Sequence, residues 1–134
     1  MVVVDAAIVV DALLDISADA ELLRRRLAQE NSTCAAPELM DAEVAYVVRR
    51  RVLRGELSAA AGEAALADLM ATRIQRHSHL PLLHRAFELR DNATIYDALY
   101  LALAEVLGAT LLTRDRALAR IPGVGAPVEV IGSG

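Results

Sequence analysis

Two aspartates stand at the ends of short apolar stretches, where a parallel sheet would carry a binding site. Asp5 follows Val2 to Val4 directly, and Asp115 comes just after the stretch from Ala109 to Leu112. Because open parallel sheets bind ligands beyond the carboxyl ends of their strands, both side chains would lie at that edge. A lone aspartate in this position more often only favours the dipole of the next helix. Two of them at one edge weaken that interpretation.

Glu43 is a third acid in an unusual position. It lies in the second turn of a helix expected to begin near Pro37, among the apolar residues Leu39, Met40, Val44, Val47 and Val48. An unpaired carboxylate on a helix face turned partly to the core is energetically costly. An intrahelical pair with Arg50 or a neighbour explains Glu43 as well as a functional role does, so both interpretations stay open.

Asp97 has the strongest structural explanation of the four acids. It stands three residues after Thr94, the spacing of a capping box at a helix start. Taken alone, this spacing favours a cap. However, the helix that follows, ALYLALAEVLGA, is nearly all apolar and is expected to be deeply buried. A carboxylate at the mouth of such a helix could bind a cation while it also accepts a backbone amide.

Several carboxylates gathered at neutral pH repel one another, and some must protonate unless a cation intervenes. Magnesium prefers oxygen ligands of this kind, and manganese accepts the same ligands. Either metal can activate a water and stabilise the leaving oxygen of a phosphodiester. Zinc is not expected, because His77, His79 and His84 do not have metal-ligand spacing with Cys34. The first two histidines are expected to form a surface pair.

The composition limits the classes of function. The formal net charge of -4 argues against a protein that coats nucleic acid by bulk charge, but not against a local grip on phosphates. All 14 basic residues are arginines, so the lysine of a P-loop and the lysine of Schiff-base chemistry are both excluded. No apolar run approaches membrane-span length, and the first residues lack a basic start, so a cytoplasmic protein without a membrane is expected. Cys34, the single cysteine, excludes an internal disulfide and is expected to be buried.

Short apolar runs alternate with helical patterns along 134 residues, which fits one domain over residues 1–134. Strands are expected at Val2–Val4, Thr33–Ala36, Arg73–His77, Ala109–Leu112 and Val128–Ile131. Helices are expected at 6–14, from Ser17 or Asp19 to about Glu30, from Pro37 to Arg54, and at 58–72, 81–90, 94–108 and 114–119. This alternation predicts an α/β fold with three layers, in which helices cover both faces of a mostly parallel central sheet.

Three segments together resemble the PIN-domain nucleases, especially the VapC-type toxins of bacterial toxin–antitoxin pairs. They are VVVDAAIVVDALL at 2–14, APELMDAEVAYVVRR at 36–50 and TIYDALYLALAEVLGATLLTRDRAL at 94–118. The resemblance implies endonucleolytic cleavage of RNA, a homodimer, and inhibition by a cognate antitoxin whose tail enters the active-site groove. It also implies a catalytic site that holds Mg²⁺, or Mn²⁺ in its place, on Asp5, Glu43, Asp97 and Asp115.

Two positions bear on how well the chain follows this family. The family often carries Ser or Thr two residues after the first aspartate, where this chain has Ala7. The missing hydroxyl would weaken the hold on metal-bound water. Thr113 matches the family's threonine before the last acid. It is expected either to hydrogen-bond a ligand carboxylate or to cap the next helix, and the sequence does not separate these roles.

The arginines and aromatic residues give weaker functional signals than the acids. The runs 24–26 and 49–51 are typical of solvated helix faces, although Arg50 lies on about the same helical face as Glu43 and could reach a phosphate. Aromatic residues make up only 3 % of the chain, which gives little support to broad base stacking. Core or dimer packing is expected for Tyr46, Phe87, Tyr96 and Tyr100.

Two other functions compete with a nuclease. A magnesium-dependent phosphoryl-transfer domain would also place acids at strand ends. However, an aspartyl-phosphate phosphatase would want a second aspartate where Ala7 stands, and a receiver domain would want a lysine. The other alternative is a catalytically inactive PIN-like module that binds RNA or protein. Ala7 is its only support, and the presence of all four acids argues against it.

Overall fold

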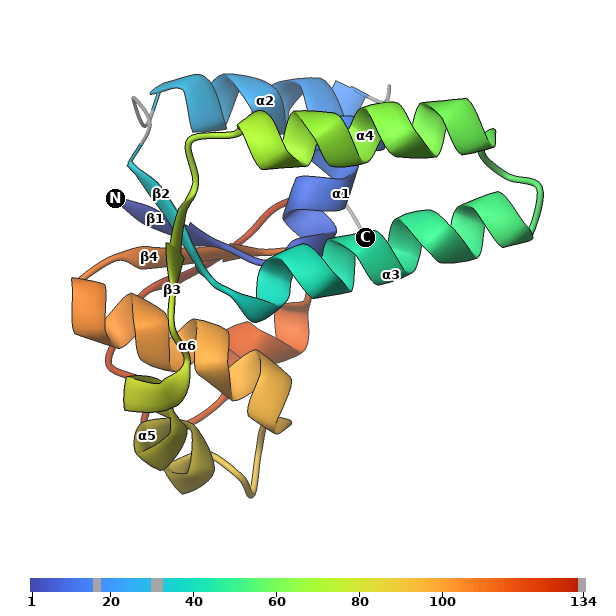
Figure 1. The fold of residues 1–134 in the computed structure, drawn as a ribbon. Coiled ribbons are helices and arrows are strands. Elements are labelled where there is room, and N and C mark those ends of the chain that lie inside the picture. Colours follow the sequence, from blue (N-terminus) through green and yellow to red (C-terminus); the bar gives the residue numbers. More distant parts are fainter. Residues whose placement is uncertain (16–17, 30–32, 133–134) are drawn as a thin grey trace.

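The structure, a computed structural model, describes residues 1–15, 18–29 and 33–132 (Figure 1). Ser17 and Glu30, expected at the two ends of the second helix, lie outside the described residues, as do the side chains of Asp19 and Leu22. Among the described segments, no helix has both the length and the apolar character needed to span a bilayer.

Five parallel strands form the central sheet in the order β3-β2-β1-β4-β5. They are β1 (Val2–Val4), β2 (Cys34–Pro37), β3 (Gln75–His77), β4 (Thr110–Thr113) and β5 (Val128–Val130). All five strands predicted from the sequence are therefore present, with ends shifted by no more than two residues. The middle of the sheet is apolar: β1 is buried throughout, and Cys34 is buried in β2.

Helices cover both faces of the sheet, as predicted (Figure 1). In the view of Figure 1, α5 (Leu83–Glu88) and α6 (Ile95–Leu107) lie below the sheet. Above it lie α1 (Ala6–Leu14), α2 (Ala18–Gln29) and α4 (Ala59–Ala71). The seven consecutive residues Ala98 to Ala104 of α6 are all buried, which confirms the deep burial expected from its apolar sequence.

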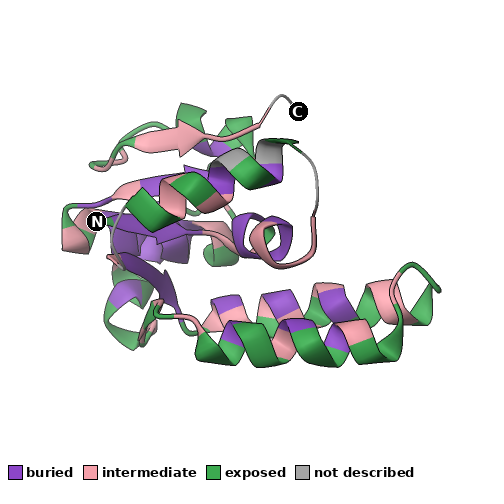
Figure 2. Ribbon diagram, turned by 90° about the horizontal axis from the view of Figure 1, so that it is seen from above, coloured by how far each residue is buried: buried purple, intermediate pink, exposed green. Residues whose placement is uncertain are grey.

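An antiparallel pair of helices, α3 (Leu39–Leu53) and α4, projects beyond the sheet (Figures 1 and 2). The chain turns between them at Gly55, whose φ of 73° is the left-handed conformation that glycine adopts most readily. Buried residues concentrate in the sheet and its covering helices, while much of the projecting pair is exposed (Figure 2). The first turns of α3 therefore lie at the sheet, and its last turns reach into solvent.

Three expected helix boundaries were wrong. Pro37 does not open a helix: it ends β2 opposite His77, and Glu38 is the residue before α3. The pairing of β2 with β1 stops at Ala35, so the missing N–H of Pro37 breaks no ladder bond to β1. The helix expected at 81–90 divides into a 3-10 turn, Leu80–Leu82, and α5. The helix expected at 114–119 is only a 3-10 turn, Arg116–Arg120.

Candidate active site

The site lies at the point between β1 and β4 where the strand order of the sheet reverses. After β1 the chain adds β2 and β3 on one side, then returns to place β4 on the other side of β1. Such a switch point leaves a crevice beyond the carboxyl ends of the two central strands. Asp5 follows β1 there, and Asp115 follows β4 at a distance of two residues in sequence. The N–H of Asp5 donates to the carbonyl oxygen of Leu112 at 3.3 Å, so the two strand ends are adjacent.

Asp5 is held by hydrogen bonds to both of its carboxylate oxygens. Its Oδ1 accepts from the backbone N–H of Ile8 at 3.0 Å and so caps α1. Its Oδ2 accepts from the hydroxyl of Thr113 at 2.6 Å. Burial raises the pKa of Asp5, and the negative charges of Asp97 and Asp11 add to this, while the two hydrogen bonds oppose it. Capping and a place in the acidic site therefore coexist in one side chain.

Thr113 links the two strand-end aspartates. It is fully buried at the end of β4, where its hydroxyl donates to Asp5 and accepts the backbone N–H of Asp115 at 3.0 Å. The following 3-10 turn is capped by Asp115 itself, whose Oδ1 accepts from the N–H of Ala117 at 2.9 Å. Of the two roles left open by the sequence, the structure therefore shows the hydrogen bond to a carboxylate.

Glu43 reaches the site from α3 and is bound by a residue that the sequence did not indicate. The hydroxyl of Tyr100 in α6 donates to Glu43 Oε1 at 2.7 Å. The intrahelical pair with Arg50 is not formed; the Arg50 guanidinium lies instead over the ring of Tyr46, 5.7 Å from its centroid. Burial raises the pKa of Glu43, and the charges of Asp97 and Asp5 raise it further against the Tyr100 hydrogen bond.

Asp97 stands in the first turn of α6, but Thr94 does the capping. The Thr94 hydroxyl accepts the backbone N–H of Asp97 at 3.1 Å. In the described part of the chain, no backbone N–H donates to the Asp97 carboxylate, so the reciprocal half of the capping box is absent. Burial raises the pKa of Asp97, and the charge of Asp115 raises it further.

The structure thus brings all four acids to one edge from four different elements. Asp97 acts electrostatically on Asp5 and Glu43, and Asp115 acts on Asp97. Within the described part of the chain, no arginine is among the groups that shift the pKa values of Asp5, Glu43 and Asp97, whereas neighbouring acids raise all three. A hard divalent cation bound among the carboxylates would reduce their repulsion.

The four carboxylates fit magnesium better than a metal that is coordinated entirely by protein ligands. The described residues contain no preassembled group of three His, Cys, Asp or Glu ligands. Magnesium keeps several of its waters and commonly binds through one or two carboxylates, so a looser arrangement of acids suits it. Zinc, which takes three or four protein ligands in tetrahedral sites, does not fit.

The histidines lie away from these acids, on the edge strand β3 and after it. They are not the simple surface pair that the sequence suggested, because His77 and His79 are both half-buried. The Nε2 atom of His77 and the Nδ1 atom of His79 are buried without a hydrogen-bond partner in the described structure. No third ligand accompanies them among the described residues.

Asp11 and Arg114 form a partly buried ion pair that was not predicted from the sequence. Asp11 lies on α1 and is largely buried, and the Arg114 guanidinium donates to its Oδ2. Asp11 is the one charged residue inside the apolar helix 6–14, and that isolation was the available signal. The pair fixes Arg114 between Thr113 and Asp115 beside the acidic site.

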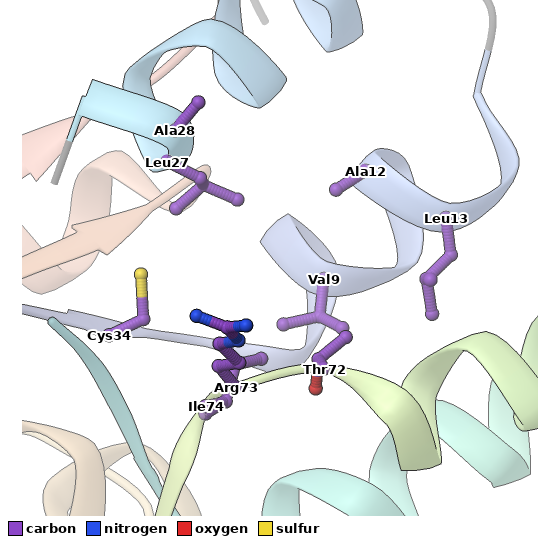
Figure 3. A pocket seen from close by; sticks show the side chains of 9 residues that line it. All are labelled: Val9, Ala12, Leu13, Leu27, Ala28, Cys34, Thr72, Arg73 and Ile74. Carbon is purple, nitrogen blue, oxygen red and sulfur yellow. The ribbon is translucent and has the colours of Figure 1, made fainter. Parts of the chain in front are cut away.

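Two neighbouring hollows share lining residues, and the first of them is lined by one of the four acids. One, of about 620 Å³, is lined by Glu43 together with Ala6, Ala7, Leu39, Ala42, Tyr46, Val47 and Tyr96. The other, of about 380 Å³, is lined by Ala7, Val10, Asp11, Val47, Arg50, Arg51 and Arg114. A third hollow, of about 270 Å³, lies elsewhere, between α1, α2 and β2 (Figure 3). Its lining is mostly apolar, with Cys34 and Arg73 and without a carboxylate, so it offers no metal site.

The chain is similar to known proteins over nearly its whole length. Residues 2–124 match the model of the PIN domain. The chain is 45% identical over 130 residues to Ribonuclease VapC1 of Mycobacterium tuberculosis strain H37Rv, covering 96% of each chain. It is 34% identical over 131 residues to Ribonuclease VapC12 of the same strain, covering 98% of this chain and 99% of that one.

Two solved structures share the fold at lower identity. A chain of VapBC2 from Rickettsia felis, bound to a DNA fragment from its promoter, superposes with a TM-score of 0.73 at 21% identity, covering 98% of this chain and 100% of that one. A chain of the DNA-bound VapBC of Salmonella typhimurium superposes with a TM-score of 0.70 at 16% identity, covering 96% of each.

Proposed function

The chain belongs to the PIN-domain family, among its VapC ribonucleases, and we propose that its four convergent acids form the metal-binding catalytic centre of an endoribonuclease. The chain cuts RNA phosphodiester bonds and acts as the toxin of a toxin–antitoxin pair. The metal ligands and catalytic residues are Asp5, Glu43, Asp97 and Asp115. The observation that carries this proposal is the convergence of these acids, from four different elements, on the topological switch point of the sheet.

The preferred metal is Mg²⁺, and Mn²⁺ would take its place. When bound, the cation supplies an activated water and stabilises the leaving oxygen. The chain's own contribution is to orient its carboxylates. Thr113 holds Asp5, Tyr100 holds Glu43, and the Thr113 hydroxyl fixes the backbone of Asp115. Such supporting hydrogen bonds orient ligands and strengthen metal affinity.

Two protein partners are proposed, one that binds at the acidic centre and one that covers an apolar surface around α5. The solved VapBC2 of Rickettsia felis and VapBC of Salmonella typhimurium are bound to DNA. For this chain we propose a cognate antitoxin that places an arginine against the acids, since a guanidinium matches carboxylates well. We also propose a homodimer that covers the exposed side chains of Leu80, Leu83 and Phe87, which lie close together in sequence around α5.

The test of the centre is RNA cleavage with the metal controlled. The purified chain should lose activity in excess chelator and regain it with Mg²⁺ or Mn²⁺, with Mn²⁺ the more effective because it generally binds more tightly. Asp68→Asn, which alters an exposed acid of α4, is the matched control and should cleave like the parent. Undiminished cleavage in excess chelator would contradict the proposal.

A further inference from the structure

The two hollows near the acids are adjacent and are together called the groove here. Ala7 of α1 and Val47 of α3 line both of them, so the aromatic hollow and the cationic hollow meet along these two residues. Glu43 lies in the first hollow, and Arg114, the neighbour of Asp115, lies in the second. The groove therefore reaches the acidic centre at Glu43 and runs beside it at Arg114, and its two halves differ in chemistry.

The aromatic half exposes two tyrosines that core packing does not explain. Tyr46 and Tyr96 are each 63% exposed, whereas Tyr100, three positions from Asp97, is buried. Of the core or dimer packing expected for Tyr46 and Tyr96, core packing is therefore wrong, and dimer packing stays a prediction. Both belong to the lining of the hollow that holds Glu43, and Tyr96 directly precedes Asp97. Exposed aromatic rings beside a nucleic-acid groove offer stacking surfaces to bases of any sequence.

The cationic half carries an excess of positive charge on a chain that is negative overall. Its lining contains Arg50, Arg51 and Arg114 against the single carboxylate of Asp11, which is paired with Arg114. In the described structure, Arg50 and Arg51 form no ion pair. The Arg50 guanidinium lies over the Tyr46 ring, a cation–π contact that joins the two halves.

We propose that this groove binds single-stranded RNA across the scissile bond, with bases stacked on Tyr46 and Tyr96 and backbone phosphates bound by Arg50 and Arg51. The inference rests on the proposed nuclease function and names the residues that position its substrate. Charge complementarity selects this occupant: phosphates match the unpaired arginines, and flat bases match the exposed rings. The strand then passes over Ala7, which lines both hollows and lies two residues after Asp5 in the sequence.

The first test separates stacking from mere apolar contact. Tyr46→Phe and Tyr96→Phe keep the ring, whereas Tyr46→Leu and Tyr96→Leu keep apolar bulk without it. Binding of a fluorescent single-stranded RNA is measured by anisotropy in chelator, so that no cleavage occurs. We expect each Leu variant to raise Kd about tenfold and each Phe variant to stay within about twofold. In cleavage assays with Mg²⁺, the Leu variants should raise KM more than they lower kcat.

The second test measures how RNA affinity depends on salt concentration, because each contact to a phosphate adds to this dependence. Arg50→Ala and Arg51→Ala should each reduce the slope of log Kd against log salt by about 0.7, the value for one contact to a single strand. Arg54→Ala, which removes an exposed arginine one turn further along and outside the groove lining, should leave the slope unchanged.

Several results would overturn the proposal. They are an RNA affinity that is equal in the Leu variants and the parent, a salt slope that Arg54→Ala lowers as much as Arg50→Ala, and a parent chain that binds no single-stranded RNA. A shift of mass from dimer to monomer in the Tyr variants would assign the rings to a protein interface instead. Failure of the proposed function is distinguishable, because it would abolish metal-dependent cleavage while this pattern of RNA binding remained.

Discussion

The two ends of helix α6 carry acids in opposite electrostatic settings. At the C-terminal end, Glu105 accepts two hydrogen bonds from Arg85, at 2.8 and 3.0 Å, and one from the N–H of Gly125 at 2.6 Å. These partners lower the pKa of Glu105. At the N-terminal end, burial and a neighbouring acid raise the pKa of Asp97. One helix thus contains a carboxylate whose charge is stabilised by hydrogen bonds and one whose charge is disfavoured, and the proposed function assigns the second to a cation.

The comparison separates stability from function. The Glu105 cluster ties α6 to α5 and to the loop before β5, and it needs nothing from solution. The Asp97 cluster brings like charges together, which weakens the fold unless a cation binds. Substitutions at the two ends should therefore have opposite effects on activity and on stability.

The largest expected effect is on catalysis at the N-terminal end. Asp97→Asn and Asp5→Asn each remove a negative charge while they keep the side chain's size and an acceptor. Each should lower kcat/KM about 100-fold or more if metal positioning supplies even ~3 kcal/mol of the barrier reduction. In chelator, Asp97→Asn should melt at or above the parent's temperature, because repulsion among the acids is relieved. Asp5→Asn should gain less, because it also loses one of the two acceptor oxygens that bind Ile8 N–H and the Thr113 hydroxyl. A folded Asp97→Asn chain with parental activity would remove Asp97 from the site.

The next effect is on stability at the C-terminal end. Glu105→Gln weakens the charged hydrogen bonds to Arg85 and Gly125, so unfolding should become easier by about 1–2 kcal/mol. RNA cleavage per folded molecule should match the parent, since Glu105 lies at the far end of α6 from the acidic site. Denaturant unfolding beside the cleavage assay checks both. A large loss of activity without loss of stability would contradict the division between the two ends.

The pH dependence of stability should follow the N-terminal cluster. The pKa values of Asp5, Glu43 and Asp97 are raised, so these groups take up protons in the folded chain before they do so in the unfolded chain. In chelator, the free energy of unfolding should therefore increase as the pH falls from 7 toward 5. Glu105 opposes this only at lower pH, because its stabilising charge is lost as the pH falls through its lowered pKa.

In saturating Mg²⁺, the free energy of unfolding should instead decrease as the pH falls from 7 to 5, because protons then compete with the metal for the carboxylates. Melting temperatures measured between pH 7 and 5, with and without Mg²⁺, test both expectations. In chelator, the increase in stability at lower pH should be smaller in Asp5→Asn than in the parent. An identical pH profile for parent and variant would refute the link to these acids.

The smallest expected effect is at Ala7. A hydroxyl at this exposed position on the first turn of α1 could hold water at the metal, as the family often does with Ser or Thr. One added hydrogen bond of about 1 kcal/mol corresponds to a rise of at most about fivefold in kcat/KM for Ala7→Ser. Steady-state cleavage kinetics with the Ala7→Gly chain as the control would show it. A rate equal to or below the parent's would mean that the missing hydroxyl is immaterial.

The order of strands and helices was predictable because each element has its own local signal. The apolar run before Asp5 and the cap at Thr94 are readable without tertiary structure, and parallel strands must bring their carboxyl ends to one edge. The expectation for Pro37 failed because proline also suits the end of a strand, and only the register of β2 against its neighbours distinguishes the two positions.

The contacts that support the acids were not predictable in the same way. Tyr100 and Glu43 are 57 positions apart, and Arg114 and Asp11 are 103 apart. Whether an aromatic residue on a helix faces the core or a groove depends on how that helix packs, which periodicity alone does not give for Tyr46 or Tyr96. Sequence reasoning therefore reached the acids themselves but not the residues that orient them.

The central claim is that the acids at the N-terminal end of α6 bind a divalent cation, and metal-dependent melting tests it most directly. A ligand that binds only the folded chain at 100 times its Kd stabilises by about 2.7 kcal/mol. Mg²⁺ and Mn²⁺ should raise the melting temperature of the parent and of Asp68→Asn, but not that of Asp97→Asn. An equal rise in Asp97→Asn, or no rise in the parent at millimolar metal, would contradict the account.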